Sequence, residues 1–366
     1  MKFAARRICS GLIALIAAQL SPAQSPHSPT LAETLSRASI RAPAIAPDAG
    51  SIAYLKRQTD WKENEFVWQL WLADVASGRN IQLTRGRKSA SAAQWSPDGQ
   101  WLAFITERES TAVETESAKG EGADADKPAA RQIWLIAPKG GEAWPLTRSA
   151  TDITEFHWSR DGKKVLFSAT MAPTKAAKAR KEKYSAYDVV EKDFDTAQLW
   201  SVDVGAAEKA AAPVPAQQLT SDLTLNVNSF AVSPDSSKVA FSATHNPQLA
   251  FLKDEDIYLL NLADPKLSVT KIVALPGPDR SPMFSTDGKQ LAFVTSLEQP
   301  NFFYANTHLA MVDLAAVMAR PATAAIDVRD LTKNFDEDPQ ALDWSPAGVY
   351  FGATQRMADH LFRVDP

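Results

Sequence analysis

Trp95-Ser96-Pro97-Asp98-Gly99, followed by the alternating segment Trp101-Leu102-Ala103-Phe104, decides the fold because this phrase recurs along the chain. Successive aspartates of the repeat are 50 to 74 residues apart. A fixed repeat of this length is typical of a repeat architecture. The other copies are Trp158-Ser159-Arg160-Asp161-Gly162, Val232-Ser233-Pro234-Asp235, Phe284-Ser285-Thr286-Asp287-Gly288, and the weaker Ala46-Pro47-Asp48-Ala49-Gly50 and Trp344-Ser345-Pro346-Ala347-Gly348.

Each repeat predicts four strands. The Pro-Asp-Gly segment favours a tight turn, because Pro presets φ, Asp bonds its own backbone and Gly accepts a positive φ. An alternating strand follows, then a third strand such as Gln69-Leu70-Trp71, and a fourth strand that ends on Leu-Thr in four repeats. We therefore expect an all-β protein, a β-propeller of about five and a half four-stranded, WD-like blades. The blades are expected to start near residues 41, 90, 153, 226, 279 and 339.

The last repeat is shorter than the others. Its third strand, His360–Asp365, is followed only by Pro366. A propeller that does not close leaves strand edges exposed. The sequence therefore predicts an incomplete ring and a chain that is the N-terminal part of a longer protein, or a truncated product.

The N-terminus is typical of an export signal. Three cations, Lys2, Arg6 and Arg7, precede an apolar run at 8–20 that is too short to span a bilayer, and small residues follow near Ala23. An uncleaved anchor is the alternative interpretation. A periplasmic or secreted protein is expected. The predicted division of the chain is a signal peptide at 1–23, a linker or short helix at 24–40 and the propeller at 41–366.

Composition excludes several classes of function. The 366 residues are 45% hydrophobic and 22% charged, with a net charge of −4. Neutralising the phosphates of a nucleic acid needs a concentrated basic surface, so a nucleic-acid partner is not expected. The one cysteine, Cys9, lies in the signal, so the mature chain has no thiol for a disulfide, a nucleophile or a metal site.

Insertions concentrate in one type of connection. Between strands one and two the turns are tight, whereas the loops between strands two and three are long, which predicts one bare face and one decorated face suited to binding. Two loops between strands three and four, at 204–216 and 315–326, break this pattern. The insertions of the decorated face are expected at 56–68, 107–131, 171–197, 244–255 and 296–307.

Segments outside the repeat resemble one family of peptidases. They are Asp60-Trp61-Lys62-Glu63-Asn64-Glu65, Tyr187-Asp188-Val189-Val190-Glu191-Lys192-Asp193-Phe194, Pro276-Gly277-Pro278-Asp279, Phe335-Asp336-Glu337-Asp338-Pro339 and His360-Leu361-Phe362-Arg363-Val364-Asp365. With the blades, they resemble the N-terminal propeller of secreted prolyl oligopeptidase family serine peptidases of the acylaminoacyl-peptidase or dipeptidyl-peptidase type. The resemblance implies a propeller that filters peptides above a C-terminal α/β-hydrolase domain carrying Ser, Asp and His. That domain is missing from this chain.

Catalytic groups are not expected here. The sequence contains no Gly-x-Ser-x-Gly nucleophile elbow, and its five histidines are interpreted as structural or surface residues. We therefore expect no catalytic residue, no cofactor and no peptidase activity from this chain alone. The acidic triplets at 254–256 and 336–338 lack EF-hand spacing, so solvated loop charge is expected instead of a metal site.

Two clusters are candidate substrate-binding residues. Trp61, Glu63 and Glu65 lie in the first insertion. The resemblance implies that such carboxylates can receive a peptide amino terminus, and an exposed loop with a packed Trp is the alternative. Tyr304 and Asn306 lie in the aromatic segment 302–306, which lines a substrate entry or, as we favour, packs on the missing domain.

The expected function is that of a non-catalytic, substrate-gating portion of an exported serine peptidase. Its expected partners are a peptide substrate and the missing α/β-hydrolase domain, with no nucleic acid and no membrane once the signal is cleaved. A free-standing protein-binding propeller of the Tol-associated periplasmic kind is the alternative, and it would require a closed ring. A propeller enzyme with a site in its central channel would need convergent carboxylates or metal ligands, which the sequence does not show.

Overall fold

The computed structural model describes residues 28–108, 130–185, 195–222, 224–297, 299, 302–320 and 326–366. The chain divides into two units, 1–37 and 38–366. In the first unit, helix α1 (Leu31–Ser36) begins at a capping box in which Thr30 accepts from the N–H of Glu33 and the Glu33 carboxylate accepts from the N–H of Thr30. The expected signal peptide at 1–23 lies outside the described residues.

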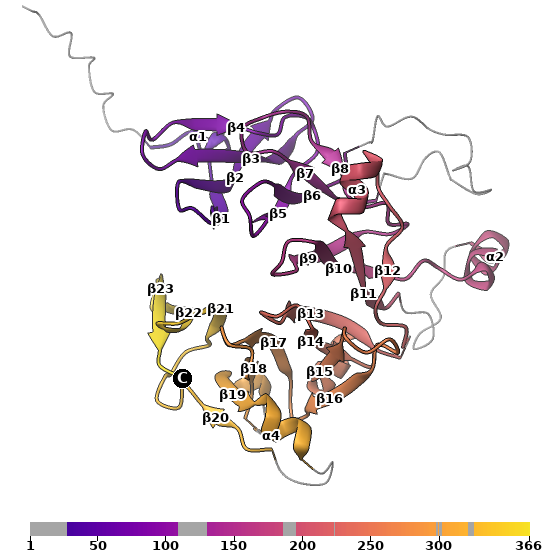
Figure 1. The fold of residues 1–366 in the computed structure, drawn as a ribbon. Helices are drawn as coiled ribbons and strands as arrows, with labels where there is room; N and C mark the ends of the chain where they lie inside the picture. The colour runs from indigo at the N-terminus through magenta and orange to yellow at the C-terminus, as the bar shows by residue number, and fades with distance from the viewer. Residues whose placement is uncertain are drawn as a thin grey trace, which may run out of the picture. The chain divides into compact units, whose positions relative to one another are not determined.

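The second unit consists of six antiparallel sheets that follow one another along the chain (Figure 1). Blade 1 contains β1 (Ile40–Ile45), β2 (Ser51–Asp60), β3 (Glu65–Asp74) and β4 (Asn80–Gln82). Blade 2 contains β5 (Ser91–Trp95), β6 (Leu102–Thr106), β7 (Gln132–Ile136) and β8 (Trp144–Pro145). Blade 3 contains β9 (Ile153–Trp158), β10 (Lys164–Thr170), β11 (Ala197–Asp203) and β12 (Gln217–Gln218). Blade 4 contains β13 (Asn226–Val232), β14 (Lys238–Thr244), β15 (Asp256–Asn261) and β16 (Val269–Val273). Blade 5 contains β17 (Asp279–Phe284), β18 (Gln290–Thr295), β19 (His308–Asp313) and β20 (Arg329–Asp330). Blade 6 contains β21 (Gln340–Ser345), β22 (Gly348–Gln355) and β23 (Ala358–Val364).

The propeller therefore has six blades in a ring, which corrects the expectation of about five and a half blades in an incomplete ring (Figure 1). The sixth sheet has three described strands, but they are long. β22 pairs with β23 from Val349–Val364 to Gln355–Ala358, and β21 pairs with the other edge of β22. The expectation of half a blade came from the missing fourth strand after His360–Asp365, whereas these three paired strands already form a sixth blade.

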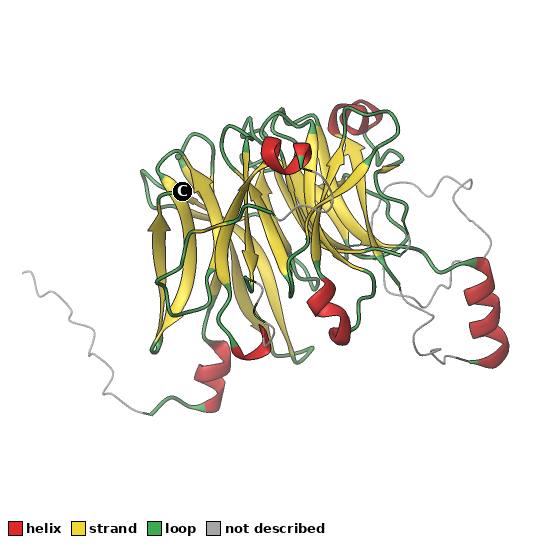
Figure 2. Ribbon diagram, turned by 90° about the horizontal axis from the view of Figure 1, so that it is seen from below, coloured by secondary structure: helices red, strands yellow, loops and turns green. Residues whose placement is uncertain are grey.

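Helices occur at both ends of the strands (Figure 2). Helix α2 (Lys175–Tyr184) and the 3-10 helices η2 (Leu249–Asp254) and η3 (Phe302–Tyr304) lie between second and third strands. Helices α3 (Val204–Ala210) and α4 (Leu314–Ala319) lie between third and fourth strands, and each begins at an aspartate that caps it, Asp203 or Asp313.

The Ser-x-Asp turns have one shared geometry. The serine hydroxyl donates to the aspartate two residues on, at 2.6 to 2.7 Å, and accepts a backbone N–H five residues on, at 2.9 Å. The hydroxyl thus closes the hairpin from within. The bond from Ser233 is the main cause that lowers the pKa of Asp235 to about 2.

Neighbouring turns contact one another through proline and glycine. Gly99 faces the ring of Pro47 in the preceding blade, and Gly162 faces Pro97 in the same way. Both glycines have φ near +70°, a conformation that L side chains rarely adopt. Between blades 3 and 4, Arg160 takes the place of the proline and Ser236 takes the place of the glycine. The backbone N–H of Arg160, a donor that proline lacks, donates to Ser236 Oγ at 2.9 Å.

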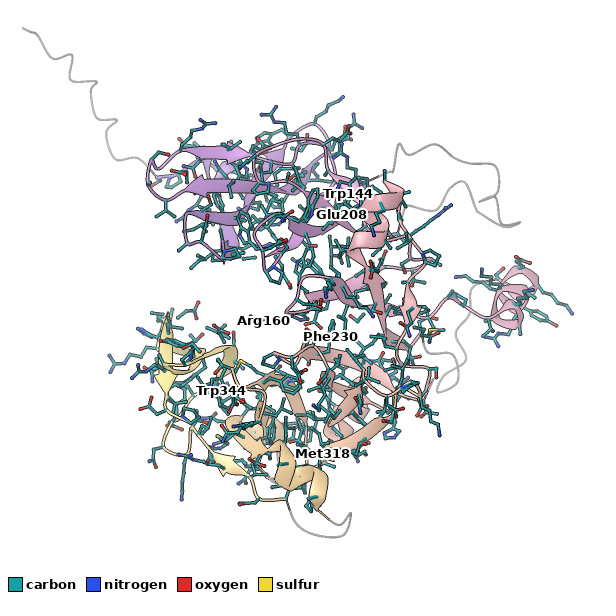
Figure 3. All side chains as sticks on the ribbon, viewed as in Figure 1. Trp144, Arg160, Glu208, Phe230, Met318 and Trp344 are labelled. Carbon is teal, nitrogen blue, oxygen red and sulfur yellow. The ribbon has the colours of Figure 1, made fainter. Side chains whose placement is uncertain are left out.

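A second contact between blades surrounds Trp101. Its indole N–H donates to Glu208 of α3 at 2.7 Å, and its ring lies edge-on to Trp144 at 5.8 Å. Glu208 and Trp144 accordingly lie side by side where blades 2 and 3 meet (Figure 3). These aromatic and charged groups extend the apolar core that blades 2 and 3 share.

The fourth-strand Leu-Thr motif satisfies a buried donor. In blade 2, Thr147 Oγ1 accepts the N–H of Ile133 at 2.9 Å and donates to Gln132. The equivalent threonines Thr84, Thr220 and Thr332 accept from third-strand N–H groups at 2.8 to 2.9 Å. The hydroxyl therefore replaces a carbonyl of the ladder where the fourth strand ends.

Thr147→Val tests this role. Valine keeps the volume of the side chain but leaves the buried N–H of Ile133 without its acceptor, so we expect a loss of about 1–3 kcal/mol in unfolding free energy. Urea denaturation measures the change. Thr286→Val, at an exposed turn position, is the control and is expected to stay within about 0.5 kcal/mol of wild type. Equal effects of both changes would contradict the role.

Candidate functional site: the channel wall and its side pocket

The first strand of every blade is interrupted by a register shift. The first strands of successive blades contact each other, so the shifts lie along the inner wall of the propeller. Bulges re-aim side chains and are frequent next to functional sites. They fall between Arg41 and Ala44, Ser91 and Gln94, Ile153 and Glu155, Val227 and Ser229, Arg280 and Met283, and Ala341 and Asp343.

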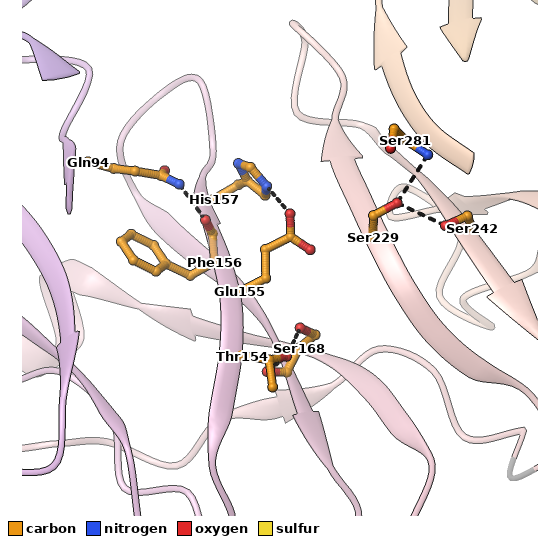
Figure 4. Close-up of polar contacts among 9 residues, drawn as sticks. All are labelled: Gln94, Thr154, Glu155, Phe156, His157, Ser168, Ser229, Ser242 and Ser281. Carbon is orange, nitrogen blue, oxygen red and sulfur yellow. Dashed lines mark hydrogen bonds and ion pairs between the residues drawn. The ribbon is translucent and has the colours of Figure 1, made fainter. Parts of the chain in front are cut away.

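A cavity of about 690 Å³ lies against the first strands of blades 3 to 6. In its wall, Oε1 of Glu155 lies 3.0 Å from Nε2 of His157 (Figure 4). Asp343 and Arg160 also line the cavity and add one charge of each sign. His157 also stacks edge-on against Phe230 at 4.8 Å. The wall is thus polar and carries charges of both signs, which suits a ligand with amide and charged groups.

Hydrogen bonds between blades hold this wall in place (Figure 4). Gln94 Nε2 of blade 2 donates to the carbonyl of Phe156 in blade 3 at 2.7 Å. The Ser281 N–H of blade 5 donates to Ser229 Oγ of blade 4 at 3.3 Å, and Ser229 pairs with Ser242 at 2.8 Å. Since the Gln94–Phe156 and Ser281–Ser229 bonds join inner strands of neighbouring blades, the bulged residues are positioned by those blades as well as by their own sheet.

A side pocket of about 280 Å³ adjoins the channel cavity, because Ser229 and Ser281 line both. Glu255, which precedes β15 and is 3% exposed, lines the pocket with the exposed Arg280. Thr244 is 2% exposed, and its hydroxyl has no hydrogen-bond partner within the described part of the chain. An unsatisfied buried hydroxyl is costly, but this oxygen is buried in the pocket wall, so the exposed Arg280 is the charged group that a ligand would meet.

Carboxylates crowd the wall behind the pocket. Burial raises the pKa of Glu255 and of Asp256, although Lys271 pairs with Asp256 at 2.6 Å. Asp279 is fully buried, and desolvation raises its pKa to about 7, helped by the nearby charges of Asp256 and Glu255. Its own N–H donates to the carbonyl of Glu255 at 2.7 Å, so this acid joins blades 4 and 5.

The predicted substrate residues lie elsewhere in the structure. Trp61, which is 55% exposed, and Glu63 lie at the tip of the β2–β3 hairpin, and Glu65 begins β3. The Glu63 carboxylate forms an ion pair with Arg87 at 3.6 Å. Tyr304, 94% exposed, ends η3, and Asn306 donates to Asp336 at 3.3 Å. None of these five residues lines the channel cavity or the side pocket.

The acidic triplets do not converge. Asp256 is paired with Lys271, and Asp338 accepts both the N–H and the hydroxyl of Thr307. Among the residues that the structure describes, no group of three or more His, Cys, Asp or Glu side chains is placed to hold a metal ion. His308 Nδ1 lies 3.2 Å from the carboxylate of Asp330, a pairing between two strands of blade 5.

Sequence reasoning missed Glu255, Thr244 and Arg280. Glu255 was noticed only as the middle of an acidic triplet, and its burial depends on the loop that η2 forms. One signal was available, because the last residue of the triplet, Asp256, begins the buried strand β15, so the triplet is not a purely solvated loop. Thr244 was expected only as the first residue of the insertion at 244–255, and nothing in the sequence marks Arg280.

The comparisons with known proteins point to peptidases. No family model matches the chain. It is 28% identical over 154 residues to the uncharacterized peptidase YuxL of Bacillus subtilis, covering 42% of this chain and 21% of that protein. It is 23% identical over 283 residues to dipeptidyl-peptidase 5 of Porphyromonas endodontalis, covering 71% and 37%. The chain therefore aligns with well under half the length of these relatives.

A solved structure shows the same fold. The acylaminoacyl peptidase of Pyrococcus horikoshii superposes with a TM-score of 0.60 at 15% identity, over 90% of this chain and 44% of that one. The expected resemblance to the propellers of such peptidases is thereby confirmed. The chain is a propeller related to those of peptidases.

Proposed function

We propose that this chain is the non-catalytic, substrate-gating propeller portion of an exported serine peptidase, whose hydrolase domain supplies the nucleophile. The observation that carries the proposal is the alignment of almost the whole propeller with less than half of a peptidase, in a sequence that has no Gly-x-Ser-x-Gly elbow. Intact, the parent protein would hydrolyse short peptides through an acyl-enzyme.

The channel wall supports a role in peptide binding. A short peptide presents amides and two charged ends, and the wall offers serine hydroxyls, the Glu155–His157 pair and Arg160. The side pocket adds Arg280 and Glu255. We assign peptide contacts to these groups, while Trp61, Glu63 and Glu65 remain proposed contacts at the rim.

The aromatic segment of blade 5 is proposed to contact the hydrolase domain. Tyr304 and Phe303 expose 94% and 67% of their surface, and large exposed aromatic side chains mark interfaces. Asn306 and Thr307 bond to Asp336 and Asp338, so the segment is attached to the linker before blade 6. Its position is therefore fixed before any partner arrives.

Hydrolysis and binding assays on the purified chain test the proposal together. Fluorogenic acylaminoacyl and dipeptidyl substrates are expected to stay intact, whereas fluorescence anisotropy of a labelled tetrapeptide is expected to show weak binding. Arg280→Ala should weaken that binding about 10-fold, because one charged hydrogen bond is lost. The control Arg329→Ala changes an exposed arginine outside both cavities and should leave binding unchanged.

Two results would contradict the proposal. Hydrolysis that copurifies with the chain would show that catalytic groups are present in it. Binding that is the same in wild type, Arg280→Ala and Arg329→Ala would place the peptide away from the channel.

A further inference from the structure

Helix α2 is a separate basic element in the second-to-third-strand loop of blade 3. Its ten residues, Lys175–Tyr184, include five cations and one carboxylate, and none of them is buried. The helix begins at Thr174, whose hydroxyl accepts the N–H of Ala177 at 3.1 Å. It therefore forms without contributing side chains to the core of the propeller.

The charge of α2 opposes that of the remaining chain. The helix carries a net charge of +4, whereas the whole chain carries −4, so the residues outside α2 carry −8. A second basic stretch, 79–88, has four cations and no carboxylate, but Arg87 and Lys88 pair with Glu63 and Glu107. An anionic surface therefore attracts α2 more strongly than the remaining chain, whose net charge is −8.

The lysines of α2 repel one another. Lys175, Lys178 and Lys181 follow at intervals of three residues, and like charges at this spacing destabilise a helix. All three are exposed, and none belongs to an ion pair within the described part of the chain. A ten-residue helix that buries nothing is marginal in water, so an anionic partner would relieve the repulsion and stabilise it.

We propose that α2 docks this protein onto an anionic lipid bilayer surface. The cations are distributed around the whole helix, since successive residues are rotated by about 100° about its axis. A planar anionic surface attracts all of those that lie within a Debye length of about 8–10 Å. A compact acidic peptide would reach only one side.

The composition of α2 also sets the depth of binding. Its residues are Lys, Arg, Glu, Ala and Tyr, so it has no broad apolar face to insert between acyl chains. No helix in the described residues is long and apolar enough to cross a bilayer. The contact is thus peripheral and electrostatic, which departs from the sequence-based expectation that the chain meets no membrane after signal cleavage.

Vesicle sedimentation of the full chain tests the inference. The wild-type chain should bind mixed phosphatidylcholine–phosphatidylglycerol vesicles more tightly than pure phosphatidylcholine vesicles. The Lys175→Gln, Lys178→Gln, Lys181→Gln triple variant should lose about 100-fold in partitioning, at about five-fold for each cation removed. Raising salt from about 0.1 M to about 1 M should abolish the difference, since the Debye length falls to about 3 Å.

The matched control removes three exposed lysines elsewhere. The control variant carries Lys139→Gln, Lys253→Gln and Lys333→Gln, so its net charge equals that of the α2 triple variant and its N-terminal segment is unchanged. It should bind anionic vesicles to within a few-fold of wild type. Equal loss in both triple variants would overturn the inference in favour of net charge alone. Absence of vesicle binding together with α2-dependent binding of a polyglutamate peptide would overturn it in favour of an acidic protein partner.

Discussion

Asp279→Asn is expected to make the protein more stable above neutral pH and to reduce the dependence of its stability on pH. Asp279 is fully buried, and its pKa is raised from 3.8 to about 7. Because the folded pKa lies above the unfolded value, the unfolded state releases this proton first as pH rises. The unfolding free energy of the wild type therefore falls between about pH 4 and pH 7, by up to about 1.4 kcal/mol per unit.

The gain in unfolding free energy of Asp279→Asn follows from the pH range over which Asp279 ionises only in the unfolded state. Full ionisation of Asp279 in the folded protein costs about 4 kcal/mol, a cost that a neutral asparagine side chain avoids. The Asn amide still accepts from the N–H of Leu275, which donates to Asp279 Oδ2 at 2.8 Å. It also buries two N–H donors, so we expect a net gain of about 1–3 kcal/mol at about pH 8.

Urea denaturation at several pH values measures this effect. A residual slope is expected in the variant, because burial also raises the pKa of Glu255 and Asp256. Asp287→Asn is the control. The Asp287 carboxylate accepts a hydrogen bond from the Ser285 hydroxyl, which lowers the pKa of Asp287. Its contribution to the unfolding free energy is therefore lost only when the pH falls below the pKa of the unfolded state. The slope of unfolding free energy against pH should thus stay unchanged from about pH 4 to 7 in Asp287→Asn. An Asp279→Asn variant with the wild-type slope would contradict the assignment.

Phe351→Ala is expected to cost about 3–5 kcal/mol in unfolding free energy, the usual range for a buried phenylalanine. Phe351 lies in β22 of the sixth blade, is 3% exposed, and contacts the rings of Phe335 and Phe362 at 5.2 and 5.3 Å. Its counterpart in blade 5 is the fully buried Phe293. If the sixth sheet is a true blade, the two alanine variants should lose similar stability.

Thermal and urea denaturation of both variants provide the measurement. Leu361→Ala is the control on the neighbouring strand, since Leu361 is exposed and truncation should change stability by less than about 0.5 kcal/mol. A Phe351→Ala variant as stable as wild type would show that blade 6 does not fold with the rest.

The repeat predicted the fold because each copy carries its own turn chemistry. Ser96 and Asp98 determine a hairpin from neighbouring residues alone, so sequence is enough to find it. The contacts between blades were not predictable. Whether Pro47 meets Gly99, or Arg160 meets Ser236, depends on turns more than fifty residues apart that only the assembled ring brings together.

The candidate site was predictable only in part. The insertion expected at 244–255 supplies Thr244 and Glu255 to the side pocket, whereas the channel wall could not be predicted. Its side chains are aimed by register shifts such as that between Ile153 and Glu155, which no residue type announces. Burial converts Glu255 from one acid of a triplet into a pocket residue, and burial of a loop residue comes from tertiary packing.

Photo-crosslinking tests the central claim most directly, namely that this propeller binds peptides at its channel and leaves their hydrolysis to another domain. A short peptide with a benzophenone side chain would be irradiated with the purified chain, and the crosslinked residues would be mapped by mass spectrometry. The account predicts intact peptide joined to β9, β13, β17 or β21, or to the loop around Glu255. Crosslinks confined to the outer strands, or recovery of cleaved peptide, would contradict it.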